Sequence, residues 1–145
     1  MKIDRIDHVE IIVDDLDAAT AFFLDLGLVV VGQAELEGEW LGRLIGLEGV
    51  KTAVVMLRIP GGQTNLELAK FYTPPDENGI RPPLANTLGI RHIAFAVEDI
   101  EAIVATLKHK GVEFFSDIYN YENSYKLCYL RGPEGIILEL AEQIK

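Results

Sequence analysis

The sequence predicts an α+β fold made of two tandem β-α-β-β-β modules that form an open, curved mixed sheet. An internal repeat aligns residues 8–30 with residues 92–114 without a gap, and both copies end in Leu-Glu-Leu-Ala, at 66–69 and 138–141. Each copy passes from strand-like alternation to helical spacing and then to strands joined by turns. Two copies are too few for a solenoid, so a paired domain with pseudo-twofold symmetry is expected.

The repeat also sets the expected domain organisation. The offset between the copies falls from 84 at their starts to 72 at their ends, so the first copy carries 12 extra residues. Residues 71–88 contain four prolines and are typical of a linker. We therefore expect a single domain, 1–145, with module one at 1–70 and module two at 89–145. Identical pairs in the two copies include His8 and His92, Asp15 and Asp99, and Gly27 and Gly111.

Module one reads as a strand, a helix and three further strands. Asp14 or Asp15 can cap the helix, and Gly27 is placed to end it. Apolar residues within the 12 extra residues have the spacing of a short amphipathic helix; they are Trp40, Leu41, Leu44 and Ile45. The expected strands are 4–13, 28–34, 51–59 and 63–70, the last two joined by a Pro60-Gly61-Gly62 turn.

Module two repeats this order. The expected helix, 99–110, ends at Gly111. The expected strands are 89–97, 112–115, 125–130 and 136–142, the last two joined by a turn at 132–135.

Composition disfavours several classes of function. The 145 residues include 13 Lys and Arg against 23 Asp and Glu, a formal net charge of −10. Binding to nucleic acid or to anionic membrane surfaces requires clustered positive charge, so neither partner is expected. No apolar run approaches the ~18 residues of a membrane span, and the first residues are charged where a signal peptide is apolar. We expect a cytoplasmic protein. Cys128 is the single cysteine and lies in an apolar run typical of a buried thiol, so no intrachain disulfide can form.

Four side chains are selected as metal ligands by the repeat itself. His8 and His92 occupy equivalent places in the opening strands, and Glu67 and Glu139 occupy equivalent places in the closing strands. Burying a carboxylate costs several kcal/mol unless it is paired or bound to a metal. Two imidazoles and two carboxylates suit a borderline divalent cation. Taken singly, each residue could instead be a hydrogen-bonded structural histidine or a solvent-facing glutamate. Because all four recur together, we favour a metal site on the inner face of the curved sheet.

The same segments resemble the vicinal oxygen chelate superfamily, which includes glyoxalase I, methylmalonyl-CoA epimerase, extradiol dioxygenases and the fosfomycin- and bleomycin-resistance proteins. The matching segments are Ile6-Asp7-His8-Val9, Asn65-Leu66-Glu67-Leu68, the run from Ile90 to Val97, Gly132-Pro133-Glu134-Gly135 and Leu138-Glu139-Leu140. The resemblance implies paired β-α-β-β-β modules, one divalent ion (Ni, Zn, Co, Fe or Mn), a small-molecule substrate and a homodimer.

The order His, Glu, His, Glu is similar to that of glyoxalase I and also fits the epimerase. The residues after Glu67, Ala69-Lys70-Phe71-Tyr72, depart from the glyoxalase I pattern and argue against glutathione recognition. The resemblance implies a lyase or isomerase that moves a proton next to a carbonyl of an oxygen-chelating substrate, with Glu67 or Glu139 as the catalytic base. The alternative is a non-catalytic protein that sequesters a small molecule, as the bleomycin-resistance type does.

Weaker candidates for substrate contacts are Glu10, Arg43, Tyr125 and Arg131. Glu10 has the strand parity of His8, and its counterpart in module two is the small Ala94. Arg43, Lys70 and Arg131 are cations that could bind a carboxylate or a phosphate, with solvent-facing charge as the alternative. Tyr119, Tyr121, Tyr125 and Tyr129 cluster near the penultimate strand, where packing explains most of them. His109 lies between two lysines and is expected to be exposed.

Overall fold

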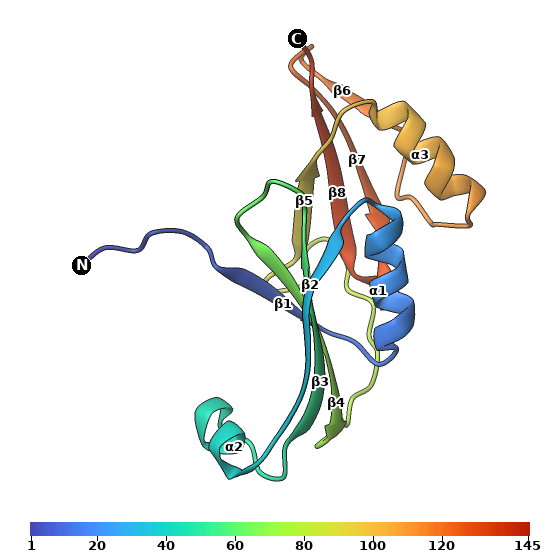
Figure 1. Ribbon diagram of the computed structural model, residues 1–145. Coiled ribbons are helices and arrows are strands. Elements are labelled where there is room, and N and C mark those ends of the chain that lie inside the picture. Colours follow the sequence, from blue (N-terminus) through green and yellow to red (C-terminus); the bar gives the residue numbers. More distant parts are fainter. The chain divides into compact units, whose positions relative to one another are not determined.

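The structure is a computed structural model that describes residues 1–145. The chain forms two compact units, residues 1–80 and residues 81–145. Both units are mixtures of strands and helix, as the α+β prediction requires (Figure 1). Each has one four-stranded sheet, and the helix follows the opening strand.

The first unit contains a sheet with the strand order β1-β4-β3-β2. The opening strand β1 pairs in parallel with the closing strand β4, and the other pairs are antiparallel. Its elements are β1 (His8–Ile12), α1 (Leu16–Asp25), β2 (Val29–Glu37), α2 (Glu39–Ile45), β3 (Lys51–Arg58) and β4 (Asn65–Thr73). The predicted helix in the 12 extra residues is therefore confirmed as α2.

The second unit repeats the topology, with the strand order β5-β8-β7-β6 and a parallel β5/β8 pair. Its elements are β5 (His92–Ala96), α3 (Ile100–His109), β6 (Tyr119–Tyr121), β7 (Tyr125–Arg131) and β8 (Ile137–Gln143), with a 3₁₀ turn at Pro133–Gly135. The β-α-β-β-β order predicted for both copies is confirmed. No helix of either unit is long and apolar enough to cross a membrane.

Two strand predictions are wrong. Residues 112–115 form no strand, because the chain touches β7 in only one bridge, Phe114 to Leu130, before it turns away at Ser116. The strand that takes this place, β6, lies further on. The opening strand begins at His8 and not at residue 4, because pairing with β4 begins where His8 faces Asn65.

The two long helices begin at the aspartates that the repeat aligns. The Asp15 carboxylate accepts a hydrogen bond from the Ala18 amide at 3.0 Å, and Asp99 does the same for Ala102 at 3.3 Å. Gly27 and Gly111 follow the helix ends with φ of +98° and +86°, which is the left-handed region that favours glycine.

In each unit the helix covers the sheet face opposite the predicted ligands. Lys70 shares its face of β4 with the fully buried Leu68, and its Nζ lies 3.5 Å from Asp14, just before α1. In the second unit the Glu142 carboxylate accepts from the Ile100 amide of α3 at 2.6 Å. Glu67 and Glu139 lie on the helix-free face because strand side chains alternate. Cys128 is buried on the helix side with its pKa raised by burial, which confirms the predicted buried thiol.

Truncating the core beneath α1 tests this packing. Phe23 is fully buried, so Phe23→Ala is expected to lower the free energy of unfolding by about 3–5 kcal/mol in urea denaturation. Leu24→Ala is the matched control, because Leu24 is 43% exposed and its loss should cost well under half as much. Equal effects of the two substitutions would contradict the packing described.

A pH test follows from the ion pair between α3 and β7. Lys126 Nζ lies 2.7 Å from Glu101 Oε1, and this hydrogen bond lowers the pKa of Glu101. Because the pKa of Glu101 is lower in the folded state than in the unfolded state, its charge stabilises the fold at pH values above the unfolded-state pKa of about 4.3. This stabilisation is lost as the pH falls through the pKa of the folded state. Glu101→Gln should therefore lower the thermal midpoint at pH 7, by an amount that shrinks below pH 4. Glu77→Gln is the control, and an undiminished difference at pH 3 would exclude a charge effect.

Candidate functional site

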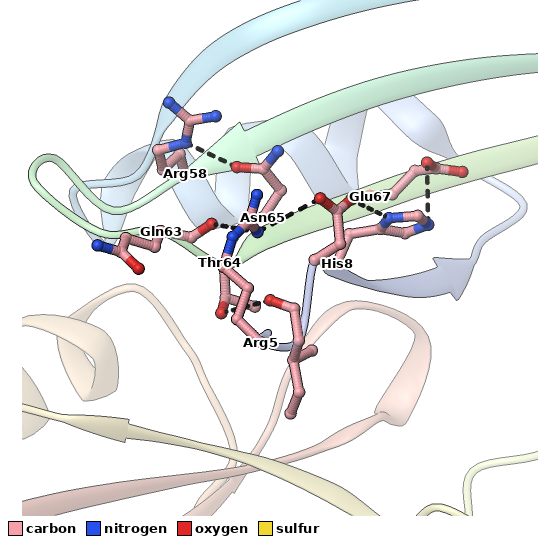
Figure 2. Close-up of polar contacts among 9 residues, drawn as sticks. Arg5, His8, Arg58, Gln63, Thr64, Asn65 and Glu67 are labelled. Carbon is pink, nitrogen blue, oxygen red and sulfur yellow. Dashed lines mark hydrogen bonds and ion pairs between the residues drawn. The ribbon is translucent and has the colours of Figure 1, made fainter. Parts of the chain in front are cut away.

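The parallel register of the first unit brings four polar side chains onto the helix-free face. His8 of β1 lies opposite Asn65 of β4, and Glu10 lies opposite Glu67. His8 Nε2 is 3.7 Å from Glu67 Oε2, and Figure 2 shows the two side chains directed toward each other. The Glu67 side chain is 16% exposed and the His8 side chain 42% exposed, so the carboxylate is more deeply buried than the imidazole.

The second unit repeats the pair. Ala94 of β5 lies opposite Glu139 of β8, and His92 precedes Ala94 on the same face. His92 Nε2 is 3.2 Å from Glu139 Oε1, and the Glu139 side chain is 13% exposed. The residues that the repeat selected are thus paired within each unit, a histidine nitrogen with a carboxylate oxygen.

Asp7 fixes the orientation of the His8 ring. His8 Nδ1 lies 2.8 Å from Asp7 Oδ2, and Arg5 lies 3.3 Å from the other oxygen of Asp7. The hydrogen bond to Asp7 raises the pKa of His8, with further contributions from the negative charges of Glu67, Asp7 and Glu10. A carboxylate that holds one ring nitrogen, with the other nitrogen directed at a ligand position, is the arrangement typical of metal-binding histidines.

Glu10 adds a second carboxyl beside Glu67. A hydrogen bond to Glu67, then burial and the charge of Glu67, raise the pKa of Glu10 to about 7. Two carboxyl groups that share a site disfavour double ionisation, so this face of the first unit carries uncompensated negative potential. That potential favours a cation.

In the second unit Glu139 has a different polar neighbour, Tyr129 of β7, which lies opposite it in the β7/β8 register, where the first unit has Met56 opposite Glu67. Burial, a hydrogen bond to Glu139 and the charge of that carboxylate raise the pKa of Tyr129. The Tyr129 ring also packs edge-on against His92, with centroids 5.2 Å apart. Sequence reasoning treated Tyr129 as packing. Counting residues back from the Gly132–Gly135 turn would have placed it opposite Glu139.

The donor chemistry fits a borderline divalent cation. Each unit offers one imidazole nitrogen and one carboxylate oxygen on the same open face, and both donor types bind zinc and its neighbours. The structure contains no group of three or more His, Cys, Asp or Glu side chains placed to hold one metal ion.

The structure places the weaker candidates for substrate contacts in different parts of the fold. Glu10 joins the His8–Glu67 pair. Arg43 lies on exposed α2, 3.8 Å from Glu39, beyond the end of the hairpin where Lys51 faces Thr73. Tyr125 faces Gln143 at the end of β7 away from the turn. Lys70 lies on the helix side, and His109 is exposed as predicted.

Arg131 shares the face of Glu139, but its guanidinium is engaged by the protein. Nη1 donates to the carbonyls of Gly135 and Pro83, and the guanidinium stacks on Phe115 at 4.7 Å.

Three further polar residues of the site region were missed from the sequence: Asp7, Asn65 and Arg58. Their signal is positional, since Arg58 and Asn65 flank the Pro60-Gly61-Gly62 turn and face each other.

Comparison with known proteins adds independent findings. The sequence profile described as the Glyoxalase/Bleomycin resistance protein/Dioxygenase superfamily matches residues 5–140. The crystal structure of a glyoxalase family protein from Bacillus cereus superposes with a TM-score of 0.94, at 42% identity, covering 100% of this chain and 97% of that one.

Two curated relatives match over most of their lengths. A 2-epi-5-epi-valiolone epimerase from an Actinomyces species is 31% identical over 92% of this chain and 76% of its own length. The Escherichia coli protein YaeR is 29% identical over 99% of both chains.

The role of Asp7 can be tested by NMR titration of the metal-free protein. Asp7→Asn removes the main cause of the raised pKa of His8, so that pKa should fall toward the ordinary histidine value of about 6.5. Asp4→Asn is the control, because Asp4 pairs with Lys2 on the surface. An unchanged His8 pKa in Asp7→Asn would contradict the hydrogen bond described.

Proposed function

Because the chain belongs to the Glyoxalase/Bleomycin resistance protein/Dioxygenase superfamily, we propose that it is a metal-dependent lyase or isomerase. It moves a proton on a carbon next to a carbonyl, in a small substrate that carries two adjacent oxygens. The observation that carries this proposal is the repeated His–Glu pair on the helix-free face of each unit.

The four proposed metal ligands are His8, Glu67, His92 and Glu139. The ion would act as a Lewis acid for the substrate carbonyl, stabilising negative charge on its oxygen. Asp7 holds His8 Nδ1–H and so leaves the Nε2 lone pair for the ligand position. The donor set suits Ni, Zn, Co, Fe or Mn.

We assign the base to Glu67. A carboxylate oxygen of Glu67 takes the proton from the α-carbon, and Glu10, hydrogen-bonded to Glu67, offers a second carboxyl that can hold it. Glu139 is hydrogen-bonded instead to the Tyr129 hydroxyl, whose raised pKa keeps it protonated and therefore unable to take up the proton. This asymmetry supports Glu67 as the proton carrier and Glu139 as a ligand.

The relative named as an epimerase supports the isomerase form of this chemistry, since epimerisation next to a carbonyl removes and returns one proton. Superfamily chemistry on small molecules fits a substrate of low molecular weight. A homodimer and a cytoplasmic location stay predictions.

Metal content tests the ligand set. After loading with Ni²⁺, Zn²⁺ or Mn²⁺ and gel filtration, elemental analysis should find bound metal in the unmodified chain. Both Glu67→Gln and His92→Ala should lose most of it, because each removes a donor from one pair. The matched controls are Glu35→Gln and His109→Ala, exposed residues away from the pairs. Unchanged stoichiometry in both site variants would overturn the quartet.

Proton transfer is read separately, by NMR of hydroxyketones and of the methylglyoxal–glutathione hemithioacetal in D₂O. The metal-loaded protein should exchange or move the α-proton of at least one, and Glu67→Gln should slow this by about 10²–10⁴-fold. Tight binding of these compounds without exchange would support the sequestering protein instead.

A further inference from the structure

The two hairpins of the repeat end in equivalent arginines with different surroundings. Arg58 of β3 faces Asn65 of β4, and Arg131 of β7 faces Ile137 of β8. Both pairs flank the turn that joins the last two strands of a unit. The contacts of Arg58 and Arg131 can therefore be compared directly, because the two arginines occupy the same structural position in the two units.

Arg131 is committed to the fold. Its Nη1 donates to two backbone carbonyls, its Nε lies 3.8 Å from Glu113, and its side chain is 19% exposed. The Phe115 ring covers one face of the Arg131 guanidinium. Few N–H groups of Arg131 therefore remain for a ligand.

Arg58 makes a single hydrogen bond. Its Nε donates to Asn65 Oδ1 at 2.7 Å (Figure 2). The terminal nitrogens make no hydrogen bond or ion pair with the protein. Asn65, where the second unit has Ile137, thus orients the guanidinium while both terminal amino groups stay available. Two parallel N–H groups on a fixed plane match the oxygens of a carboxylate or a phosphate.

Arg58 lies in the same row of the sheet as His8. A row here is a set of residues that lie side by side across the paired strands β1, β4 and β3. One row is His8, Asn65 and Arg58, and the adjoining row is Glu10, Glu67 and Met56. Along the paired stretches of β1, β3 and β4 on this face, Arg58 is the one cationic residue among the carboxylates of the first unit. The next position of the second row is Gly32, where a Cβ would meet only Met56, so no side chain covers the face there.

We propose that Arg58, positioned by Asn65, binds an oxyanion group of the substrate, a carboxylate or a phosphate. This inference rests on the proposed function and narrows its substrate to hydroxyketones with an anionic end. Arg58 and Glu67 lie on neighbouring strands in adjoining rows, so the anion is several carbon atoms from the chelating oxygens. The cations proposed from the sequence, Arg43, Lys70 and Arg131, do not supply this contact because each is engaged or placed elsewhere.

Matched five-carbon probes test it. D-Xylulose is neutral, D-xylulose 5-phosphate carries a phosphate and 5-hydroxy-4-oxopentanoate carries a carboxylate, and all three share the hydroxyl–carbonyl pair. Affinities are measured by calorimetry or NMR titration at fixed ionic strength. The unmodified protein should bind one anionic probe about tenfold or more tightly than xylulose, because a charge-assisted hydrogen-bonded pair is worth about that ratio.

Arg58→Gln should remove this preference and leave xylulose affinity unchanged, whereas Arg58→Lys should restore part of it. Asn65→Ile, which copies the second unit, should weaken it partially. Arg131→Gln is the matched control and should lower the thermal midpoint without changing the preference. Whichever anionic probe depends on Arg58 identifies the oxyanion as carboxylate or phosphate.

The outcomes separate this inference from the proposed function. Metal content is measured on every variant, and Arg58→Gln should keep its metal. Titrations are repeated after EDTA treatment, so a preference that depends on Arg58 supports the inference even where the metal role fails. No anion preference in the unmodified protein, or one that survives in Arg58→Gln, overturns it.

Discussion

The parallel register between the opening and closing strands of each unit is the constraint on which the site depends. In the first unit it places Glu67 beside Glu10, and in the second it places Glu139 beside Ala94. A slip of one residue would turn every side chain to the other face. Glu67 would then lie under α1, where an unpaired buried carboxylate costs several kcal/mol. The buried leucines on either side of each glutamate, all at most 6% exposed, prevent that slip.

The two His–Glu pairs are equivalent in ligands and different in surroundings. The first lies among carboxylates, with Asp7 behind His8 and Glu10 beside Glu67. The second has an aromatic neighbour, Tyr129, which contacts both His92 and Glu139. Negative charge is therefore concentrated on one half of the repeat, which is where a compensating cation is most favourable. The acidic net charge of the chain does not predict this local distribution.

Much of the fold was predictable from the sequence because the repeat and the helix signals agree. Asp15, Asp99, Gly27 and Gly111 mark helix boundaries by local chemistry, and the structure confirms them. The wrong strand at 112–115 has the right composition but only one bridging partner, and composition carries no information about partners. The ligand pairs could be proposed because each residue recurs. Arg58, Asn65 and Tyr129 were missed because their importance lies in cross-strand neighbours, which appear only once the register is known.

The different fates of Arg58 and Arg131 follow from the turns that they flank. In the second unit the turn at Pro133–Gly135 presents the Gly135 carbonyl to Arg131, which satisfies it from within the hairpin. In the first unit the carbonyl of Gln63 accepts instead from Arg5, which lies ahead of β1 (Figure 2). Arg5 thus does for one turn what Arg131 does for the other. The Gln63 carbonyl is exposed, and Arg58 donates to Asn65 instead of to a carbonyl of its own turn. A duplicated module can in this way keep one copy of a residue for the fold and leave the other free to bind a ligand.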